Sequence, residues 1–170
     1  MGHVEDIKNL TSLTKWVQSQ FDPKLNWDDV KRIKDWWGGK LIIKGIMDPD
    51  DAKMAQKCGA DALVVSNHGG RQLDGVNSSI SMLPQIKKAI SGIEVLFDGG
   101  ISSGQDILKA IALGAEGVMI GRSFVYGLSA KGKKGVKNAL EILNKELDMT
   151  MALCGRRDIC LLYTSDAADD

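Results

Sequence analysis

Four short apolar runs, each followed directly by polar or glycine residues, constrain the fold of this chain most strongly. The runs cover residues 41–43, 62–65, 95–97 and 118–120 and are rich in isoleucine, leucine and valine. None of them alternates between apolar and polar residues. Continuous runs of this kind are typical of parallel strands that are buried on both faces, although short buried helices would look the same in the sequence.

Helix signals separate these runs. Asp48 precedes a proline and two acids, a pattern that predicts a helix N-cap, and Gly59 is placed to end that helix. Residues 103–106 resemble a capping box, and Gly114 is placed to end the helix that follows it. The alternation of strands and helices predicts βαβ units with a parallel sheet, which leaves a doubly wound sheet and a TIM barrel both open.

Three further segments have apolar residues at helical spacing. They carry Val30, Ile33 and Trp37 after an Asn26 cap; Leu83, Ile86 and Ile90; and Val136, Leu140, Leu143 and Leu147. With them the chain contains four strand–helix units. An eight-stranded barrel needs about 250 residues, so 170 residues correspond to roughly half of one.

Composition excludes several classes of protein. The 22 basic and 22 acidic side chains cancel, so no long-range attraction draws the chain to nucleic acid or to an anionic membrane. The four tryptophans, at 16, 27, 36 and 37, lack a basic stripe beside them, and we expect them to pack rather than to stack on bases. No apolar run approaches the ~20 residues of a membrane span.

The three cysteines are scattered and contain no CxxC pair. This spacing predicts neither a zinc site nor a disulfide framework, and a reducing cytosol is the expected environment. Residues 160–170 have no helical or strand period and resemble a reading frame that continues through a sequencing adapter. We therefore expect one domain over residues 1–159 and a non-native tail over residues 160–170.

Glycine and charged residues follow the last two apolar runs. Asp98-Gly99-Gly100 follows one run, Gly121-Arg122 follows the other, and a helix is predicted to begin near Ser103. Glycines admit backbone N–H groups to an anion, a helix N-terminus adds positive potential, and arginine offers a two-pronged donor. Each of these two segments alone could be a simple turn, but together they favour a phosphate-binding site.

The first two runs are followed by groups suited to acid–base chemistry. His68 and Arg71 flank two glycines, and this arrangement suits a small carboxylate held by Arg71 while His68 moves a proton. The structural alternatives are a loop histidine bonded to backbone and an ion pair between Arg71 and Asp74. Lys44 is either a solvated residue at a strand end or a fixed positive charge beside the reacting group.

These segments are similar to those of the FMN-dependent α-hydroxy-acid dehydrogenases and oxidases. The resemblance is carried by residues 41–45, 65–74, 97–100 and 120–122, and the run Ser-Asn-His-Gly-Gly-Arg-Gln at 66–72 is highly specific. Residues 20–23, 44–49 and 151–155 resemble the L-lactate dehydrogenase branch. The resemblance implies an α/β fold consisting of strands five to eight of an FMN-binding TIM barrel, a half-barrel fragment.

The resemblance also implies a role for each matching residue. His68 would be the catalytic base and Arg71 would bind the substrate carboxylate. Lys44 would face the flavin N1/O2 edge, and Ser66 would contact the flavin. The segments expected to hold the FMN ribityl chain and phosphate are Asp98, Gly99, Gly100, Ile101, Ser102, Gly121 and Arg122. Ser102 stands where the family usually has arginine, so one charged contact to the cofactor is replaced.

The function implied by the resemblance is oxidation of L-lactate or a similar 2-hydroxy acid to the 2-oxo acid. The electron acceptor would be a cytochrome, a quinone or oxygen. The intact enzyme would be a homo-oligomer. It would lie in the cytoplasm, with peripheral attachment at the inner membrane face as the alternative. A phosphate-binding barrel enzyme without FMN is the runner-up. A third alternative is a non-enzymatic half-barrel that folds by pairing with another copy or with the missing half.

Overall fold

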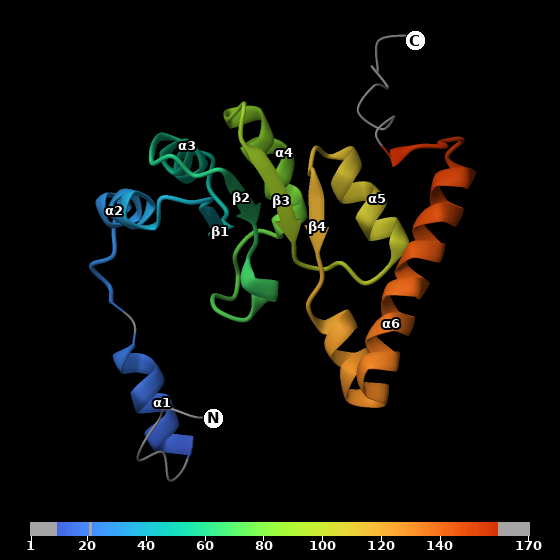
Figure 1. The fold of residues 1–170 in the computed structure, drawn as a ribbon, viewed down its shortest axis with the longest axis horizontal. Helices are drawn as coiled ribbons and strands as arrows, with labels where there is room; N and C mark the ends of the chain where they lie inside the picture. Colours follow the sequence, from blue (N-terminus) through green and yellow to red (C-terminus); the bar gives the residue numbers. More distant parts are fainter. Residues whose placement is uncertain (1–9, 21, 160–170) are drawn as a thin grey trace.

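The computed structural model describes residues 10–20 and 22–159 of the chain. Its centre is a four-stranded sheet in the order β1-β2-β3-β4, with every neighbouring pair parallel (Figure 1). The strands are β1 (Ile42–Ile46), β2 (Ala62–Val65), β3 (Glu94–Asp98) and β4 (Gly117–Met119). All four apolar runs are therefore strands. A doubly wound sheet reverses its strand order, and this sequential order is instead that of a barrel.

Helices connect the strands and flank them. They are α1 (Leu10–Ser19), α2 (Trp27–Trp37), α3 (Pro49–Lys57), α4 (Ser79–Ala89), α5 (Gly104–Ala112) and α6 (Arg122–Leu153), with a 3-10 turn, η1 (His68–Gly70), after β2. The predicted caps are confirmed: the Asp48 side chain accepts from the backbone at the start of α3, and Ser103 and Asp106 form a capping box on α5. Gly59 and Gly114 both have positive φ after their helices.

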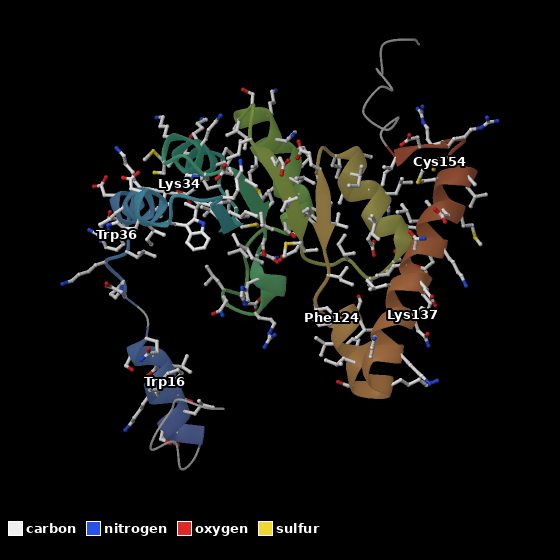
Figure 2. All side chains as sticks on the ribbon, viewed as in Figure 1. Trp16, Lys34, Trp36, Phe124, Lys137 and Cys154 are labelled. Atoms are coloured by element: carbon white, nitrogen blue, oxygen red, sulfur yellow. The ribbon has the colours of Figure 1, made fainter. Side chains whose placement is uncertain are left out.

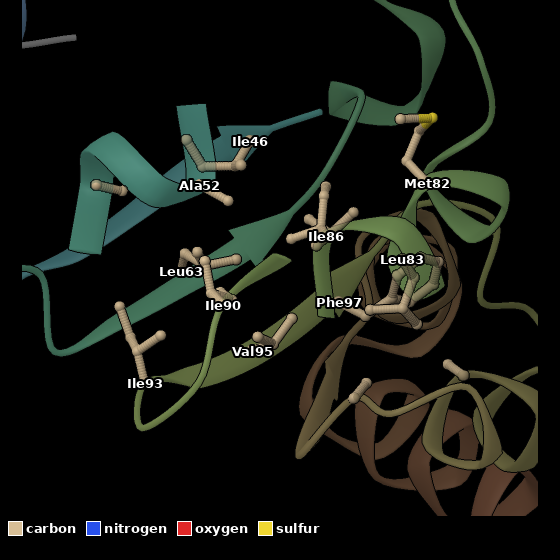
Figure 3. Packing of buried hydrophobic residues seen from close by; sticks show 14 of the residues in the cluster. Ile46, Ala52, Leu63, Met82, Leu83, Ile86, Ile90, Ile93, Val95 and Phe97 are labelled. Atoms are coloured by element: carbon tan, nitrogen blue, oxygen red, sulfur yellow. The ribbon is translucent and has the colours of Figure 1, made fainter. Parts of the chain in front are cut away.

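The hydrophobic core lies between the sheet and the helices that cover its outer face. Leu63, Val65, Val95 and Phe97 point to this side and pack against α4, whose Leu83, Ile86 and neighbouring Ile90 are also buried (Figure 3). Burying each large apolar side chain contributes about 1.5–3 kcal/mol. Most of these residues belong to the central strands β2 and β3, so the core holds the strands in place and thereby positions the loops at their carboxyl ends.

The opposite face of the sheet is open at its two outer strands. Only β2 is buried at every position, whereas Ile42 of β1 is 52% exposed and Met119 of β4 is 41% exposed. The prediction that every strand is buried on both faces is therefore wrong for β1 and β4. The cause is that each outer strand has a neighbour on one side only.

The predicted helical segment with Val136, Leu140, Leu143 and Leu147 is confirmed within α6. Before it, Lys131 and Gly132 leave helical φ and ψ and let the chain turn back on itself, where Gly127 and Gly135 meet.

The expectation that all four tryptophans pack needs correction. Of the four tryptophans, Trp27 packs against the core, but Trp16, Trp36 and Trp37 are exposed on the peripheral helices α1 and α2 (Figure 2). The predicted non-native tail over residues 160–170, and with it the predicted domain boundary after residue 159, lies outside the described residues and stays a prediction.

Within residues 10–20 and 22–159, no helix is both long and apolar enough to cross a bilayer. The same residues contain no group of three or more His, Cys, Asp or Glu placed to hold a metal ion. Cys58 and Cys154 are free thiols.

Candidate active site

A cavity of about 850 Å³ lies at the carboxyl ends of the strands. η1 and the first turns of α6 lie at this end of the sheet (Figure 1). Ten of the eleven site residues named from the sequence line the cavity: Lys44, His68, Arg71, Asp98, Gly99, Gly100, Ile101, Ser102, Gly121 and Arg122. The eleventh, Ser66, lies directly behind this lining and is bonded to two of its members. The fold thus brings all eleven residues to one end of the sheet.

Ser66 joins three of the predicted site residues through one hydroxyl group. It is 2% exposed, accepts a hydrogen bond from Lys44 Nζ at 2.9 Å and donates one to Asp98 Oδ1. It also accepts the backbone N–H of His68 at 3.1 Å. Lys44 Nζ forms an ion pair with Asp98 Oδ2 at 2.5 Å, so the ammonium group is held on the cavity wall rather than free in solvent.

The turn that carries His68 is strained. His68 has φ +58°, the one positive φ among the described non-glycine residues, and Gly69 and Gly70 follow at +68° and +72°. The Asn67 side chain accepts from Gly69 N at 3.0 Å, and Asn67 O accepts from Gly70 N at 3.1 Å. A left-handed residue with a Cβ costs about 1–2 kcal/mol, and such strain is typically found at functional sites.

Arg71 follows this turn with its side chain exposed beside the same cavity. The structural alternative, an ion pair with Asp74, is absent from the described part of the chain. His68 is likewise exposed, and its hydrogen bond to Ser66 uses the backbone and leaves the imidazole ring uncommitted. The two groups that the sequence assigns to a substrate are therefore accessible from the cavity.

The predicted positive end of α5 is already neutralised. Asp106 accepts from the backbone N–H groups of Ser102 and Ser103 at 3.0 and 2.9 Å, and Glu146 of α6 accepts from Gly104 N at 2.9 Å. Burial raises the pKa of Asp106, but the hydrogen bonds from Ser102 and Ser103 outweigh it and hold that pKa below its usual value. The expectation that the helix near Ser103 supplies positive potential to an anion is wrong, because two carboxylates occupy its N-terminus.

The helix that offers free donors is α6. It begins at Arg122, and its N-cap, Gly121, makes no side-chain capping bond. A Cβ added at Gly121 or at Gly100 would meet nothing within 4 Å, so both glycines border open space. The Ser123 hydroxyl donates to Ile101 O at 3.1 Å and fixes this helix start against the loop after β3. A helix N-terminus beside a guanidinium group is suited to binding a phosphate group.

An apolar part of the cavity wall was not predicted from the sequence. It consists of Met119 and Ile120 at the end of β4 and of Phe124, Val125 and Tyr126 in the first turns of α6. Because these residues lie directly beside Gly121 and Arg122 in the sequence, they could have been predicted to lie near the phosphate site. Their spacing did not predict that a helix begins at Arg122 and that its first turns line the cavity.

Comparison with known proteins agrees with this site. The family described as FMN-dependent dehydrogenase matches residues 2–168. This chain belongs to the FMN-dependent dehydrogenase family. The assignment excludes the runner-up, because a barrel enzyme that binds phosphate without FMN would fall outside this family.

Among similar curated proteins are two bacterial L-lactate dehydrogenases. The one from Caulobacter vibrioides is 52% identical, over 99% of this chain and 47% of its own length. The one from Allorhizobium ampelinum is 51% identical, over 89% of this chain and 40% of its own length. This member of the FMN-dependent dehydrogenase family thus spans about half the length of the curated relatives it matches.

Solved structures of mandelate oxidase are similar to the same region. One is 41% identical, with a TM-score of 0.84 over 91% of this chain and 45% of that chain. Another, a variant with a monooxide FMN adduct, is 44% identical with a TM-score of 0.79 over 84% and 46%. The four strands and their helices therefore correspond to part of a TIM barrel, as expected for this family.

The residues present fit FMN, the cofactor of this family. A phosphate group would fit at the uncapped start of α6, beside Arg122 and the open glycines Gly100 and Gly121. The apolar wall of the cavity, which includes Met119 and Tyr126, provides a surface for the flavin ring. Gly99 must remain without a side chain, because a Cβ there would collide with the Ser79 hydroxyl. Ile101 is 8% exposed, and Ser102 donates both N–H and hydroxyl to Asp106. Ser102 therefore has no free donor to replace the family's arginine.

Proposed function

We propose that this chain forms the carboxyl-terminal half of the barrel of an FMN-dependent dehydrogenase that oxidises L-lactate or a similar 2-hydroxy acid to the 2-oxo acid. The observation that carries the proposal is the single cavity that holds the His68–Arg71 pair and the Gly121–Arg122 phosphate site together. The names of the bacterial relatives support the choice of substrate.

Each role follows from the chemistry of a group on the cavity wall. Arg71 binds the substrate carboxylate with two parallel hydrogen bonds, which orients the hydroxyl-bearing carbon. His68 removes a proton from the bound substrate, because its ring is exposed and uncommitted. When bound, FMN supplies the acceptor for the two electrons that leave the substrate. Lys44, held by Asp98 and Ser66, maintains a positive charge in the cavity where negative charge develops.

The electron acceptor, assembly and location of the intact enzyme belong to the same proposal. We expect a homo-oligomer in the cytoplasm, and the free thiols of Cys58 and Cys154 suit that reducing compartment. Fractionation of cells that produce the intact enzyme tests this location against attachment to the inner membrane face. Reoxidation of the lactate-reduced enzyme by a cytochrome, a quinone analogue or oxygen identifies the acceptor class.

A chimaera provides the direct test. Residues 1–159 of this chain replace the matching half of the L-lactate dehydrogenase from Caulobacter vibrioides, and the purified protein is examined for a flavin spectrum. We expect bound FMN that is bleached by L-lactate without air, with no bleaching by D-lactate. A colourless chimaera of native secondary structure would contradict FMN binding, and a yellow chimaera indifferent to every 2-hydroxy acid would contradict the substrate class.

A further inference from the structure

Helix α6 consists of two segments that lie against each other. The short segment, residues 122–130, begins at the phosphate site, and the long segment, residues 133–153, packs along α5 (Figure 1). Lys131 and Gly132 form the reversal between them, and Gly127 of the short segment then meets Gly135 of the long one. This contact links the helix start at the phosphate site to the helix that covers α5.

The two segments approach so closely that neither glycine has room for a side chain. A Cβ on Gly135 would lie 1.8 Å from the carbonyl oxygen of Gly127 and 2.6 Å from its carbonyl carbon. A Cβ on Gly127 would lie 2.5 Å from the carbonyl oxygen of Gly135. Atoms in ordinary contact are about 3.5–4.0 Å apart, and a backbone carbonyl cannot rotate aside as a side chain can. A methyl group at either position must therefore push the segments apart.

The long segment is the fixed partner in this contact. At the start of α5, a Cβ on Gly104 would lie 2.0 Å from the backbone nitrogen of Leu147, so α5 and the long segment also touch through their backbones. The Glu146 carboxylate accepts the backbone N–H of Gly104 at 2.9 Å, and Leu143 of the same segment is 6% exposed. Any displacement between the two segments therefore falls on the short one.

A displaced short segment changes the direction of the helix start at the phosphate site. The Ser123 hydroxyl is bonded to Ile101 O and holds that end of the segment. With Ser123 as a pivot, a shift of about 1 Å at Gly127 tilts the helix by about 10°, because four residues span about 6 Å. Groups that bind a ligand need to stay within about 0.5 Å of their productive positions.

We propose that the long segment of α6 sets the separation of the two loops that bind the cofactor phosphate, and that Gly135 is a positioning residue for that phosphate. One loop leads into α5, which touches the long segment at Gly104, and the other begins the short segment, which touches it at Gly127. Gly135 does not line the cavity, so it acts through Gly127. This inference rests on the proposed function, because the phosphate is that of FMN.

The affinities of the flavin-free chimaera for FMN and for riboflavin, which lacks the phosphate group, test the proposal by fluorescence titration. Gly135→Ala and Gly127→Ala should each weaken FMN binding about tenfold or more and riboflavin binding by less than about threefold. Hydrogen bonds to a phosphate are directional, whereas apolar contact with the ring tolerates a small tilt. Leu143→Ala is the control: it removes buried packing from the same segment without adding an atom, and should keep the ratio of the two affinities.

The angle between the two segments is measurable without any flavin. Residual dipolar couplings of the backbone N–H groups in the 170-residue chain should report a change of about 10° between the segments in Gly135→Ala. Leu143→Ala should leave the angle unchanged. If the glycine variants do not fold, Ser123→Ala removes the pivot without a clash and should lower the ratio of FMN to riboflavin affinity in the chimaera.

Several results would overturn this inference, with circular dichroism showing that each variant is folded. An unchanged segment angle in Gly135→Ala would refute the contact as a positioning device. Equal losses of FMN and riboflavin binding would assign Gly135 a general structural role, and an unchanged affinity ratio in Ser123→Ala would remove the helix start from phosphate binding. A parent chimaera that binds neither flavin would instead refute the proposed function, whereas normal FMN binding by both glycine variants would refute this inference alone.

Discussion

The two ends of the sheet hold their charged side chains in opposite ways. At the amino end, Asp61 accepts from two lysines and a backbone N–H, and Glu116 accepts from one of each. At the carboxyl end, His68 and Arg71 are exposed beside a cavity, and His68 occupies a strained backbone conformation. The first arrangement satisfies both carboxylates inside the protein. The second satisfies Asp98 through Lys44 and Ser66 but leaves His68 and Arg71 available to a ligand.

This difference separates stability from function within one small sheet. The paired carboxylates of Asp61 and Glu116 stabilise the strand starts at the amino end. Strained or accessible groups contribute little to stability and are maintained by the rest of the fold. Substitutions at the carboxyl end should therefore change function and spare stability, and substitutions at the amino end should do the reverse.

The largest expected effect is on the proton transfer by His68. In the chimaera, His68→Gln should slow flavin reduction by L-lactate about 10²- to 10⁴-fold, since an amide cannot act as a general base. Stopped-flow absorbance measures the rate, and the flavin spectrum should show that FMN remains bound. A rate within twofold of the parent would remove His68 from the mechanism.

The next effect concerns the phosphate site. Arg122→Ala should weaken FMN binding by the chimaera about tenfold to a hundredfold, because hydrogen bonds to a charged group contribute about 1.5–3 kcal/mol. Fluorescence titration of the flavin-free protein measures the affinity. Arg157→Ala, at an exposed site beyond the end of α6, is the control and should bind FMN normally. Equal losses in both variants would contradict a specific phosphate contact.

A substitution that relieves the backbone strain at His68 should raise stability although it removes a functional side chain. His68→Gly should raise the free energy of unfolding of the 170-residue chain by about 1 kcal/mol, because glycine adopts φ +58° without a Cβ clash. Arg71→Gly, at φ −92°, should lower it instead. Urea unfolding followed by circular dichroism compares them, and a destabilised His68→Gly variant would show that the turn is not strained.

At the amino end, Glu116→Ala should lower the free energy of unfolding by about 1 kcal/mol and leave FMN binding by the chimaera unchanged. It removes the acceptor of Val95 N and the partner of Lys87. Urea unfolding and fluorescence titration on the same samples provide both readouts. A loss of FMN affinity comparable to that of Arg122→Ala would contradict the separation of the two ends.

The smallest effect is a pH dependence at Asp61. Hydrogen bonds from Lys34 and then Lys40, with a further one from Leu41 N, hold the pKa of Asp61 well below its usual value. The folded protein thus favours the ionised carboxylate more than the unfolded chain does. The stabilisation is present above about pH 4 and is lost as the pH falls below it. Melting temperatures of wild type and Asp61→Asn should converge on acidification, and parallel curves would contradict this.

The amino-acid sequence contained most of the local structure. Asn26, Asp48 and Ser103 specify helix starts through bonds within three residues, and Gly59 and Gly114 end helices because they adopt positive φ. Such signals are short-range and are therefore visible in the sequence. The exposure of Ile42 and Met119 was not visible, because it depends on whether a neighbouring strand is present.

Local sequence determined which segments become strands and helices, and which chemical groups follow each strand. The run at residues 66–72 by itself also indicated the family. Only the tertiary structure decided that α6, and not α5, has free backbone N–H donors at its N-terminus. The Glu146 side chain, 42 residues away in the sequence, accepts the backbone N–H of Gly104 at the start of α5. It likewise decided that Ser66 joins Lys44 to Asp98. Both outcomes depend on contacts between distant segments, and those contacts exist only after the chain has packed.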